Sequence, residues 1–265
     1  MPEEINIGEI IDKFLDTESR AKVIGSYYPS EAGMCMRRVY YSYMIPKRED
    51  RHSLRIFALG NNIHSFLADA LKTAGDFSIV NEEVPVRINY SDEETTFSIY
   101  GRMDDFIVTQ EGKKIIIEAK SVSDINRVES PDEKHLMQIN LYLKAEAADY
   151  GMLVYIDKKN MDIRQFRVDF NEELYNKTVQ RIKDLDLHLK TGKLPPAEYY
   201  FNDQKVWECK YCPYRNECME AIAKAFGIIT LYLNKVGIWT KPRTPQARFG
   251  LASMPFCKYL DRALS

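Results

Sequence analysis

The sequence of 265 residues lacks an apolar run long enough to cross a membrane. Its longest nearly apolar stretch, residues 225–233, is far shorter than the roughly 18 residues that a membrane-spanning helix requires. The amino terminus begins Met1-Pro2-Glu3-Glu4 and lacks the basic start and apolar segment of a secretory signal. We therefore expect a cytoplasmic protein without membrane contacts and without structural disulfides.

Glycine and proline are scarce, at 12 and 11 residues, which excludes a fibrous protein. Hydrophobic residues make up 45% and aromatic residues 12% of the chain, which excludes an intrinsically disordered one. No internal repeat or low-complexity tract is present. One compact fold with added ends follows, and we expect an amino-terminal region at 1–55, a core domain at 56–195, a cysteine-rich segment at 196–220 and a basic extension at 221–265.

An excess of positive charge is also missing, because 37 Lys and Arg residues face 39 Asp and Glu residues. The charge is uneven: residues 221–265 carry a net +6, which leaves −8 for residues 1–220. An acidic body suits a site for divalent cations, and contact of the body with a polyanion has to come from local patches such as residues 47–55. In the extension, aromatic residues are interleaved with basic ones. This pattern suits single-stranded DNA, but it equally suits a solvated surface beside a packed segment.

The hydrophobic pattern changes several times between helical and strand spacing. It predicts helices at 56–74, 132–148 and 172–190. It predicts three antiparallel strands at 83–89, 97–108 and 114–121, and a later hairpin of strands at 152–156 and 163–168. This order indicates a mixed α/β (α+β) domain with helices packed on a central sheet.

The end of the predicted strand at 114–121 carries an acidic and a basic side chain. Glu118 and Lys120 are two residues apart, so both emerge on the same side of the strand. A hairpin turn brings Asp104 of the preceding strand close to Glu118. Two carboxylates can hold Mg²⁺, and His64 of the upstream helix can add a ligand if the ion is Mn²⁺. The alternative is an ordinary ion pair between Glu118 and Lys120, with a structural His64.

The predicted helix at 132–148 places Gln138 and Tyr142 one turn apart on a polar stripe. Beside a metal site, these side chains can orient an attacking water or hold a phosphate. A solvated helix face is the alternative interpretation.

Together, these motifs resemble those of one nuclease family. Four of them occur in the order typical of the RecB-like branch of the PD-(D/E)XK nuclease superfamily: His64, Gly101-Arg102-Met103-Asp104, Glu118-Ala119-Lys120 and Gln138 with Tyr142. The resemblance implies a restriction-endonuclease-like core at 56–195, with a central mixed sheet flanked by helices. It also implies metal ligands at Asp104 and Glu118, assisted by His64. Lys120 would be catalytic, and Gln138 and Tyr142 would lie over the site. Asp104, rather than the adjacent Asp105, is the matching position.

Four of the five cysteines form a pattern that is typical of metal binding. Cys209, Cys212 and Cys218 are close in sequence, and Cys35 can complete a tetrahedral set across the fold. We regard Cys257 as a bystander. Four thiolates bind either Zn²⁺ or an iron–sulfur cluster, and spacing alone does not choose between them.

The cysteine pattern is similar to that of the CRISPR-associated iron–sulfur exonuclease family and of the AddB-type recombination nucleases. The similarity includes two flanking segments, Tyr28-Pro29-Ser30 ahead of Cys35-Met36-Arg37-Arg38 and Leu194-Pro195-Pro196 ahead of Cys209. The resemblance implies a [4Fe-4S] cluster, held by the four cysteines, that staples a helical region around the nuclease core.

The implied function is that of a Mg²⁺- or Mn²⁺-dependent deoxyribonuclease, an exonuclease of single-stranded DNA that can also cut internally. Divalent ions polarise phosphate and activate water, and Lys120 adds a positive charge beside the reacting group. CRISPR spacer acquisition with integration proteins as partners and DNA recombination or repair in a host or virus both fit. The alternative is a non-catalytic iron–sulfur or zinc protein that binds DNA or acts as a scaffold, and the intact set of acids and lysine argues against it.

Overall fold

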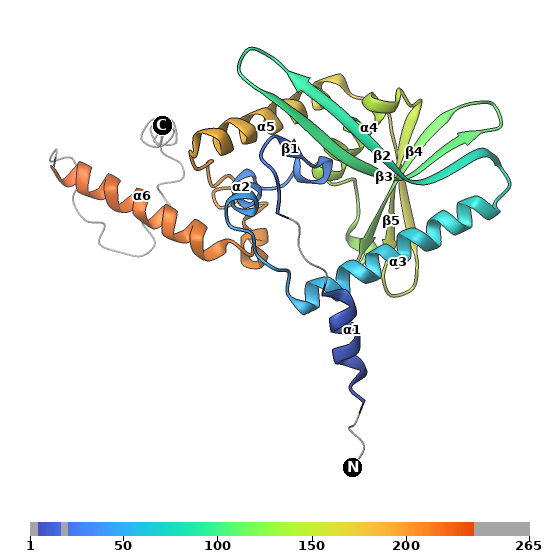
Figure 1. Ribbon diagram of the computed structural model, residues 1–265, viewed down its shortest axis with the longest axis horizontal. Coiled ribbons are helices and arrows are strands. Elements are labelled where there is room, and N and C mark those ends of the chain that lie inside the picture. The colour runs from blue at the N-terminus through green and yellow to red at the C-terminus, as the bar shows by residue number, and fades with distance from the viewer. Residues whose placement is uncertain (1–4, 17–20, 236–265) are drawn as a thin grey trace. The chain divides into compact units, whose positions relative to one another are not determined.

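The computed structural model describes residues 5–16 and 21–235 (Figure 1). Its contacts divide the chain into two units. Unit 1 contains the described residues up to Met34 together with Lys47–Asp184, and unit 2 contains Cys35–Pro46 together with the chain from Leu185 onward. Cys257 and most of the predicted basic extension lie outside the described residues.

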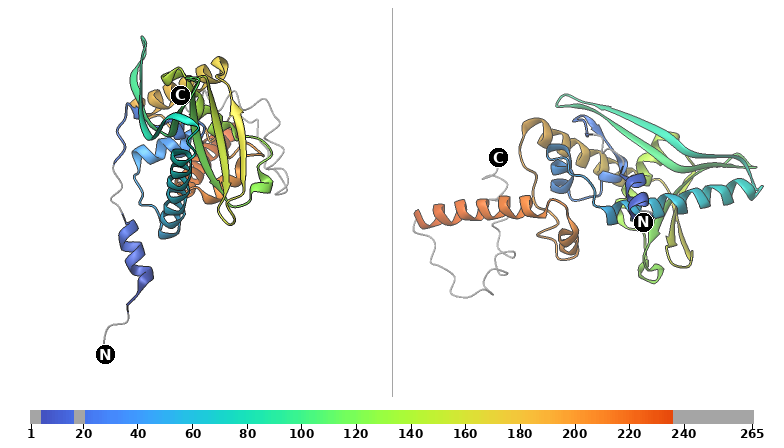
Figure 2. Two further views of the ribbon diagram at one scale, coloured as in Figure 1. Left: turned by 90° about the vertical axis from the view of Figure 1, so that its right-hand side faces the viewer. Right: turned by 60° about the horizontal axis from the view of Figure 1, so that its bottom comes forward.

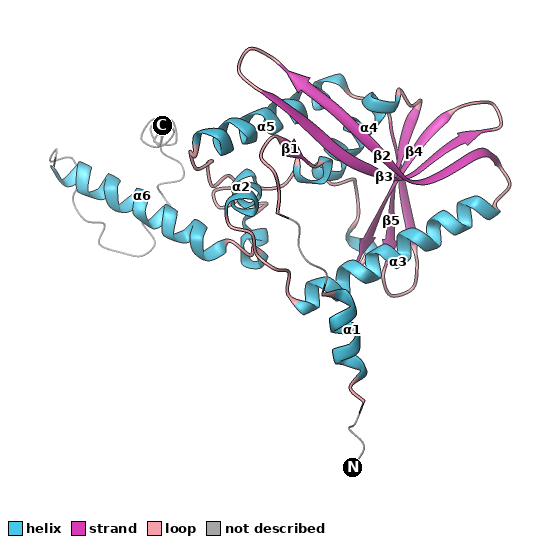
Figure 3. Cartoon of the chain, in the orientation of Figure 1, coloured by secondary structure: helices cyan, strands magenta, loops and turns pink. Residues whose placement is uncertain are grey.

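Unit 1 is built on a six-stranded sheet (Figure 3). Its strands are β1 (Ser26–Tyr27), β2 (Phe77–Ser91), β3 (Thr96–Thr109), β4 (Lys114–Val122), β5 (Tyr150–Asp157) and β6 (Ile163–Val168). They are ordered β1-β3-β4-β5-β6, and β2 pairs with β3 outside this order. The β1–β3 and β4–β5 pairs are parallel, whereas β2–β3, β3–β4 and β5–β6 are antiparallel. The predicted mixed α+β fold with a central mixed sheet is therefore confirmed.

Two helices cover the two sides of this sheet (Figure 2). The two helices belong to a set of α-helices in the described residues: α1 (Ile7–Leu15), α2 (Met36–Met44), α3 (Arg51–Thr73), α4 (Glu133–Glu146), α5 (Glu172–Thr191) and α6 (Arg215–Lys235). Ile63 of α3 packs with Ile115 and Ile117 of β4, whereas Ile139 of α4 packs with Ile116. Because neighbouring residues of a strand point to opposite sides, β4 is buried on both sides and its sequence is a continuous apolar run.

The helices and strands predicted from the periodicity are all present, and two of them begin five or six residues earlier than expected. Helix α3 begins at Arg51 rather than at 56, because the Asp50 carboxylate accepts a hydrogen bond from the Ser53 N–H and caps the helix. Strand β2 begins at Phe77 rather than at 83. The periodicity did not predict α1, α2 or β1. Across the part of the chain that the structure describes, no helix combines the length and apolarity that a membrane crossing needs.

Candidate active site

The candidate active site of unit 1 lies where strands β3 and β4 separate. Their pairing ends at Asp105 and Ile117. Beyond this pair, the backbone N–H of Ala119 on β4 donates to the Asp104 carboxylate at 2.9 Å. A buried N–H needs an acceptor, so the side chain of Asp104 takes the place of a strand carbonyl. We name this point the fork.

A local distortion of the sheet accompanies the fork. Glu83 of β2, whose neighbours pair with Met103 and Asp105, has a φ of 54°, a value that non-glycine residues seldom adopt. Met103 packs in the apolar cluster under α4, whereas Ile107 packs in the cluster under α3. Both have odd numbers and would share one side of a regular strand. The side chains of β3 therefore change sides between Met103 and Ile107, although the β2–β3 register is continuous here.

Helix α3 brings His64 to the fork from one side of the sheet. Its Nδ1 lies 3.3 Å from Asp104 Oδ1. The hydrogen bond to the Asp104 carboxylate raises the pKa of His64, because it favours the charged imidazolium. The neighbouring Ile63 is buried against the sheet and fixes this turn of α3. The structure thus brings together His64 and Asp104, two of the expected site residues.

Glu118, Lys120 and Gln138 form a hydrogen-bonded triangle at the same fork. Lys120 Nζ lies 2.6 Å from Glu118 Oε1 and 3.1 Å from Gln138 Oε1. Gln138, on α4, donates its Nε2 to the same Glu118 Oε1 at 2.6 Å. Burial raises the pKa of Glu118 above its ordinary value, although the positive charge of Lys120 acts in the opposite direction.

The other oxygen of Glu118 has no partner among the residues that the structure describes. The residue is 1% exposed, and its Oε2 is buried without a hydrogen bond from any described residue. A buried carboxylate oxygen of this kind costs free energy unless a cation or a donor meets it. Oxygens of Glu118 and Asp104, with a nitrogen of His64, are a suitable ligand set for Mg²⁺ or Mn²⁺. The chemistry fits a divalent ion, although no three His, Cys, Asp or Glu side chains among the described residues form a ready metal cage.

Tyr142 packs against the backbone of β3 instead of facing open space. It is 2% exposed, its hydroxyl donates to the Arg102 carbonyl at 3.0 Å, and Gln138 Nε2 donates to that hydroxyl at 3.5 Å. Burial raises the pKa of Tyr142, so the hydroxyl keeps its proton. Gly101 makes room for the ring, because a Cβ there would lie 2.8 Å from Tyr142 Cε1 and 2.9 Å from its oxygen. This role of Gly101 was not predicted, although a lone glycine in a strand pattern signals a close approach.

Asp105 is a further buried carboxylate beside the fork, and the motif comparison had set it aside. It is 1% exposed, and its Oδ1 has no partner among the described residues. Burial, reinforced by the charge of Asp104, raises the pKa of Asp105 to about 6. Its register partner is Ile117, which packs in the cluster under α3. The structure shows how the two adjacent acids differ: Asp104 contacts Ala119 and His64, whereas Asp105 pairs with Ile117.

Comparison with known proteins identifies the family of this chain. The model of the PD-(D/E)XK nuclease superfamily matches residues 40–219. The chain belongs to this superfamily. The resemblance inferred from the motifs is thereby confirmed. Nucleases of this superfamily use divalent metal ions, in agreement with the ligands that meet at the fork.

One curated relative and one solved structure match most of the length of this nuclease. The CRISPR-associated exonuclease Cas4 of Saccharolobus solfataricus is 29% identical over 205 residues, which make up 76% of this chain and 90% of the relative. The crystal structure of SSO0001 superposes with a TM-score of 0.57 at 23% identity, covering 79% of this chain and 94% of SSO0001. The second match shows a shared fold.

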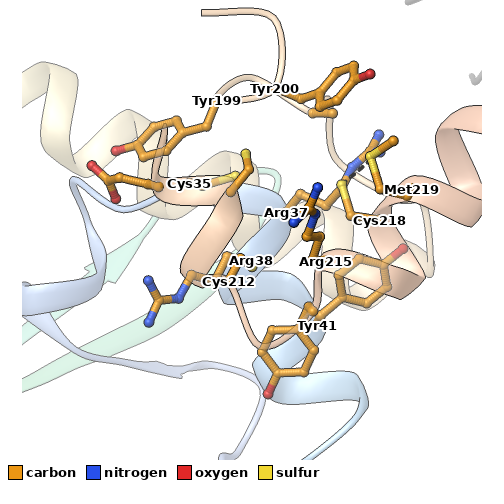
Figure 4. Close-up of a pocket in the computed structure, with 14 residues that line it drawn as sticks. Cys35, Arg37, Arg38, Tyr41, Tyr199, Tyr200, Cys212, Arg215, Cys218 and Met219 are labelled. Carbon is orange, nitrogen blue, oxygen red and sulfur yellow. Dashed lines mark hydrogen bonds between the residues drawn. The ribbon is translucent and has the colours of Figure 1, made fainter. Parts of the chain in front are cut away.

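Unit 2 of the nuclease contains a second group of candidate functional residues, the four expected cysteines. They lie just before α2, in the short helix η3 (Val206–Tyr211), directly after it and in the first turn of α6: Cys35, Cys209, Cys212 and Cys218. All four are thiols and line one pocket, which we name the thiol pocket (Figure 4). Burial raises the pKa of the Cys35 thiol to about 11, and a bound metal would displace its proton. Four sulfur donors in one pocket fit either an iron–sulfur cluster or Zn²⁺.

Proposed function

We propose that this nuclease is a Mg²⁺- or Mn²⁺-dependent exonuclease of single-stranded DNA. The observation that carries the proposal is the buried Oε2 of Glu118, for which residues 5–16 and 21–235 provide no hydrogen-bond partner. A divalent ion at the fork supplies the positive partner that this oxygen needs. The alternative of an ordinary ion pair leaves the oxygen unexplained, because Lys120 and Gln138 both contact Oε1.

In this proposal, Asp104 and Glu118 hold the ion, and His64 assists from α3. When bound, the ion supplies positive charge to the phosphate and lowers the pKa of a water molecule. The Ala119 N–H keeps the Asp104 carboxylate in place. The proposed ligands therefore come from β3, β4 and α3, and the fold holds them in place before any substrate binds.

Lys120 is the proposed catalytic cation. Its ammonium is held between Glu118 and Gln138, where it can neutralise charge that develops on the phosphate. Tyr142 acts through Gln138, because its hydroxyl joins that amide to the backbone of β3. We thus assign Tyr142 a positioning role and leave the contact with water or phosphate to Gln138.

The name of the Saccharolobus relative supports exonuclease activity and a CRISPR-associated setting. Within that setting we propose a role in spacer acquisition, with integration proteins as partners. Recombination or repair of host or viral DNA is the competing setting. Co-purification of the tagged chain with the integration proteins of the same genome supports the first setting, and co-purification with recombination proteins supports the second.

End-labelled DNA tests the nuclease proposal. We expect linear single strands to shorten progressively with Mg²⁺ or Mn²⁺, and circular single strands and duplexes to be cut more slowly. Glu118→Gln and Lys120→Met should slow cleavage by about 10³-fold, whereas the matched changes Glu111→Gln and Lys113→Met, at the exposed β3–β4 turn, should leave the rate unchanged. Cleavage in excess chelator would disprove the metal requirement. Binding of DNA without cleavage under any divalent ion would favour the scaffold alternative.

We also propose that the four cysteines hold a [4Fe-4S] cluster. The supporting observation is that they belong to one unit and line one pocket, although about 170 residues separate the first from the other three. Iron and sulfide analysis of protein purified without oxygen tests this assignment. Stoichiometric zinc without iron or sulfide would replace the cluster with a tetrathiolate zinc site.

A further inference from the structure

One cation of unit 2 is buried in the thiol pocket. Arg37 lies in the first turn of α2, is 4% exposed and lies beside Cys218 (Figure 4). Its Nε donates to the Pro195 carbonyl at 2.7 Å, and its Nη1 donates to Cys218 Sγ at 3.7 Å. The guanidinium therefore joins the segment with the first cysteine to the segment with the last.

The described residues offer this guanidinium no carboxylate at ion-pair distance. The carboxylate of Glu198 contacts the first residue of α2, where it accepts a hydrogen bond from the Met36 N–H at 2.7 Å. A carbonyl such as that of Pro195 satisfies one N–H group but does not neutralise the charge. Burying a cation is costly unless an anion accompanies it. Glu208 also lines the pocket, but its carboxylate lies 4.0 Å from the Lys205 ammonium and has no ion pair with Arg37. The anion that contacts Arg37 is sulfur, because the thiols become thiolates when a metal binds.

We propose that Arg37 is the buried counter-ion of the iron–sulfur cluster and raises its reduction potential through the hydrogen bond to Cys218. This inference rests on the cluster proposed for the thiol pocket. Four thiolates outweigh the positive charge of an iron–sulfide core, so the bound group is an anion. One electron from an external donor makes it more negative. A cation and an N–H donor at one sulfur stabilise the more negative state more strongly, and both charge and hydrogen bonds set the potentials of such clusters.

Reduction potentials of three variants test this role. The full chain is purified without oxygen and titrated with dithionite while the paramagnetic signal of the reduced cluster is recorded. Arg37→Gln removes the charge, and Arg37→Lys keeps the charge but loses the planar donor fork. Arg38→Gln is the matched control, because Arg38 lines the same pocket but acts on Cys35 through its backbone N–H, which the substitution leaves in place.

We expect Arg37→Gln to lower the midpoint potential by about 59 mV, which is a tenfold change in the one-electron equilibrium. Arg37→Lys should lower it less, and Arg38→Gln should match the wild type. Unchanged potential in Arg37→Gln at full iron content overturns the proposal, as does an equal shift in Arg38→Gln. If Arg37→Gln loses its iron, Arg37→Lys decides: a lowered potential supports the proposal and a wild-type potential overturns it.

The metal content of the wild type separates this inference from the proposed cofactor. Zinc in place of iron removes the cluster and, with it, the role of Arg37 in reduction. Full iron with unshifted potentials in the Arg37 variants removes only the role of Arg37. DNA cleavage is measured on the same preparations, so failure of the nuclease proposal is recognised independently of either result.

Discussion

The fork in unit 1 and the thiol pocket in unit 2 both gather residues from distant parts of the sequence, but they are held together differently. At the fork, protein groups bind one another: Lys120 lies within 3.1 Å of both Glu118 and Gln138, and a backbone N–H fixes Asp104. In the thiol pocket, the sulfur atoms line a common space without forming a ready metal cage. We therefore expect that a metal at the fork would complete the chemistry, whereas a metal in the thiol pocket would complete the structure.

Substitution of Glu118 should affect the cleavage rate at the fork much more than the stability of the protein. Glu118→Gln should lower the cleavage rate by about 10³-fold, the upper range for loss of one group that stabilises developing charge. Its melting temperature should not fall, because the substitution removes a buried charge whose Oε2 has no partner. Single-turnover cleavage and thermal unfolding measure the two quantities. A variant that loses both would show that Glu118 is mainly structural.

In the thiol pocket, loss of a metal ligand should instead lower the stability of the protein. Cys35→Ser should lose iron and lower the free energy of unfolding by about 3 kcal/mol or more, as expected for loss of a metal site. Limited proteolysis should then cut unit 2 before unit 1. Cys257→Ser is the control and should change neither iron content nor stability. If Cys35→Ser loses iron without loss of stability, the thiol pocket does not depend on its metal.

Gly101→Ala should both lower stability and slow cleavage at the fork. A Cβ would come within 2.9 Å of the Tyr142 hydroxyl and within 2.7 Å of Pro29 Cγ, so the chain must shift. Overpacking of this kind costs about 2 kcal/mol, and displacement of Tyr142 should slow cleavage. Gly227→Ala is the matched control, because a Cβ there meets nothing within 4 Å, and a helical Gly-to-Ala change stabilises by about 0.5–1 kcal/mol. Urea unfolding compares them, and wild-type stability in Gly101→Ala would contradict the close approach.

The smallest effect concerns Tyr142→Phe, which keeps the buried ring and removes the hydroxyl. Loss of one neutral hydrogen bond to the Arg102 carbonyl should cost about 1 kcal/mol of stability and a similar amount of transition-state stabilisation. Because Tyr142 acts through Gln138, the double variant with Gln138→Leu should be no slower than Gln138→Leu alone. Additive losses in cleavage rate would instead indicate a direct contact of Tyr142 with substrate.

The sequence predicted the elements that obey simple periodicity, because the burial of an apolar face dominates their placement. Spacing placed Glu118 and Lys120 on one side of the strand predicted at 114–121, whereas the structure adds that helices cover both sides of that strand. The fork itself was not predictable. It depends on the positive φ of Glu83 and on the exchange of sides within β3, which no local pattern records. Arg37 was equally hidden, since charge patterns cannot show that a cation is buried.

The discontinuity of unit 2 has a consequence for the newly made chain. Cys35 leaves the ribosome about 170 residues before Cys209, and synthesis at about 5–20 residues per second separates them by roughly 9–35 s. Residues 47–184, which carry the fork, are complete within this interval. Small domains fold in milliseconds to about a second, whereas the 25 residues from 184 to 209 take roughly 1–5 s to synthesise. Maturation therefore has a fixed order, in which the catalytic core is folded while the early thiol still waits for the partners with which it shares a pocket.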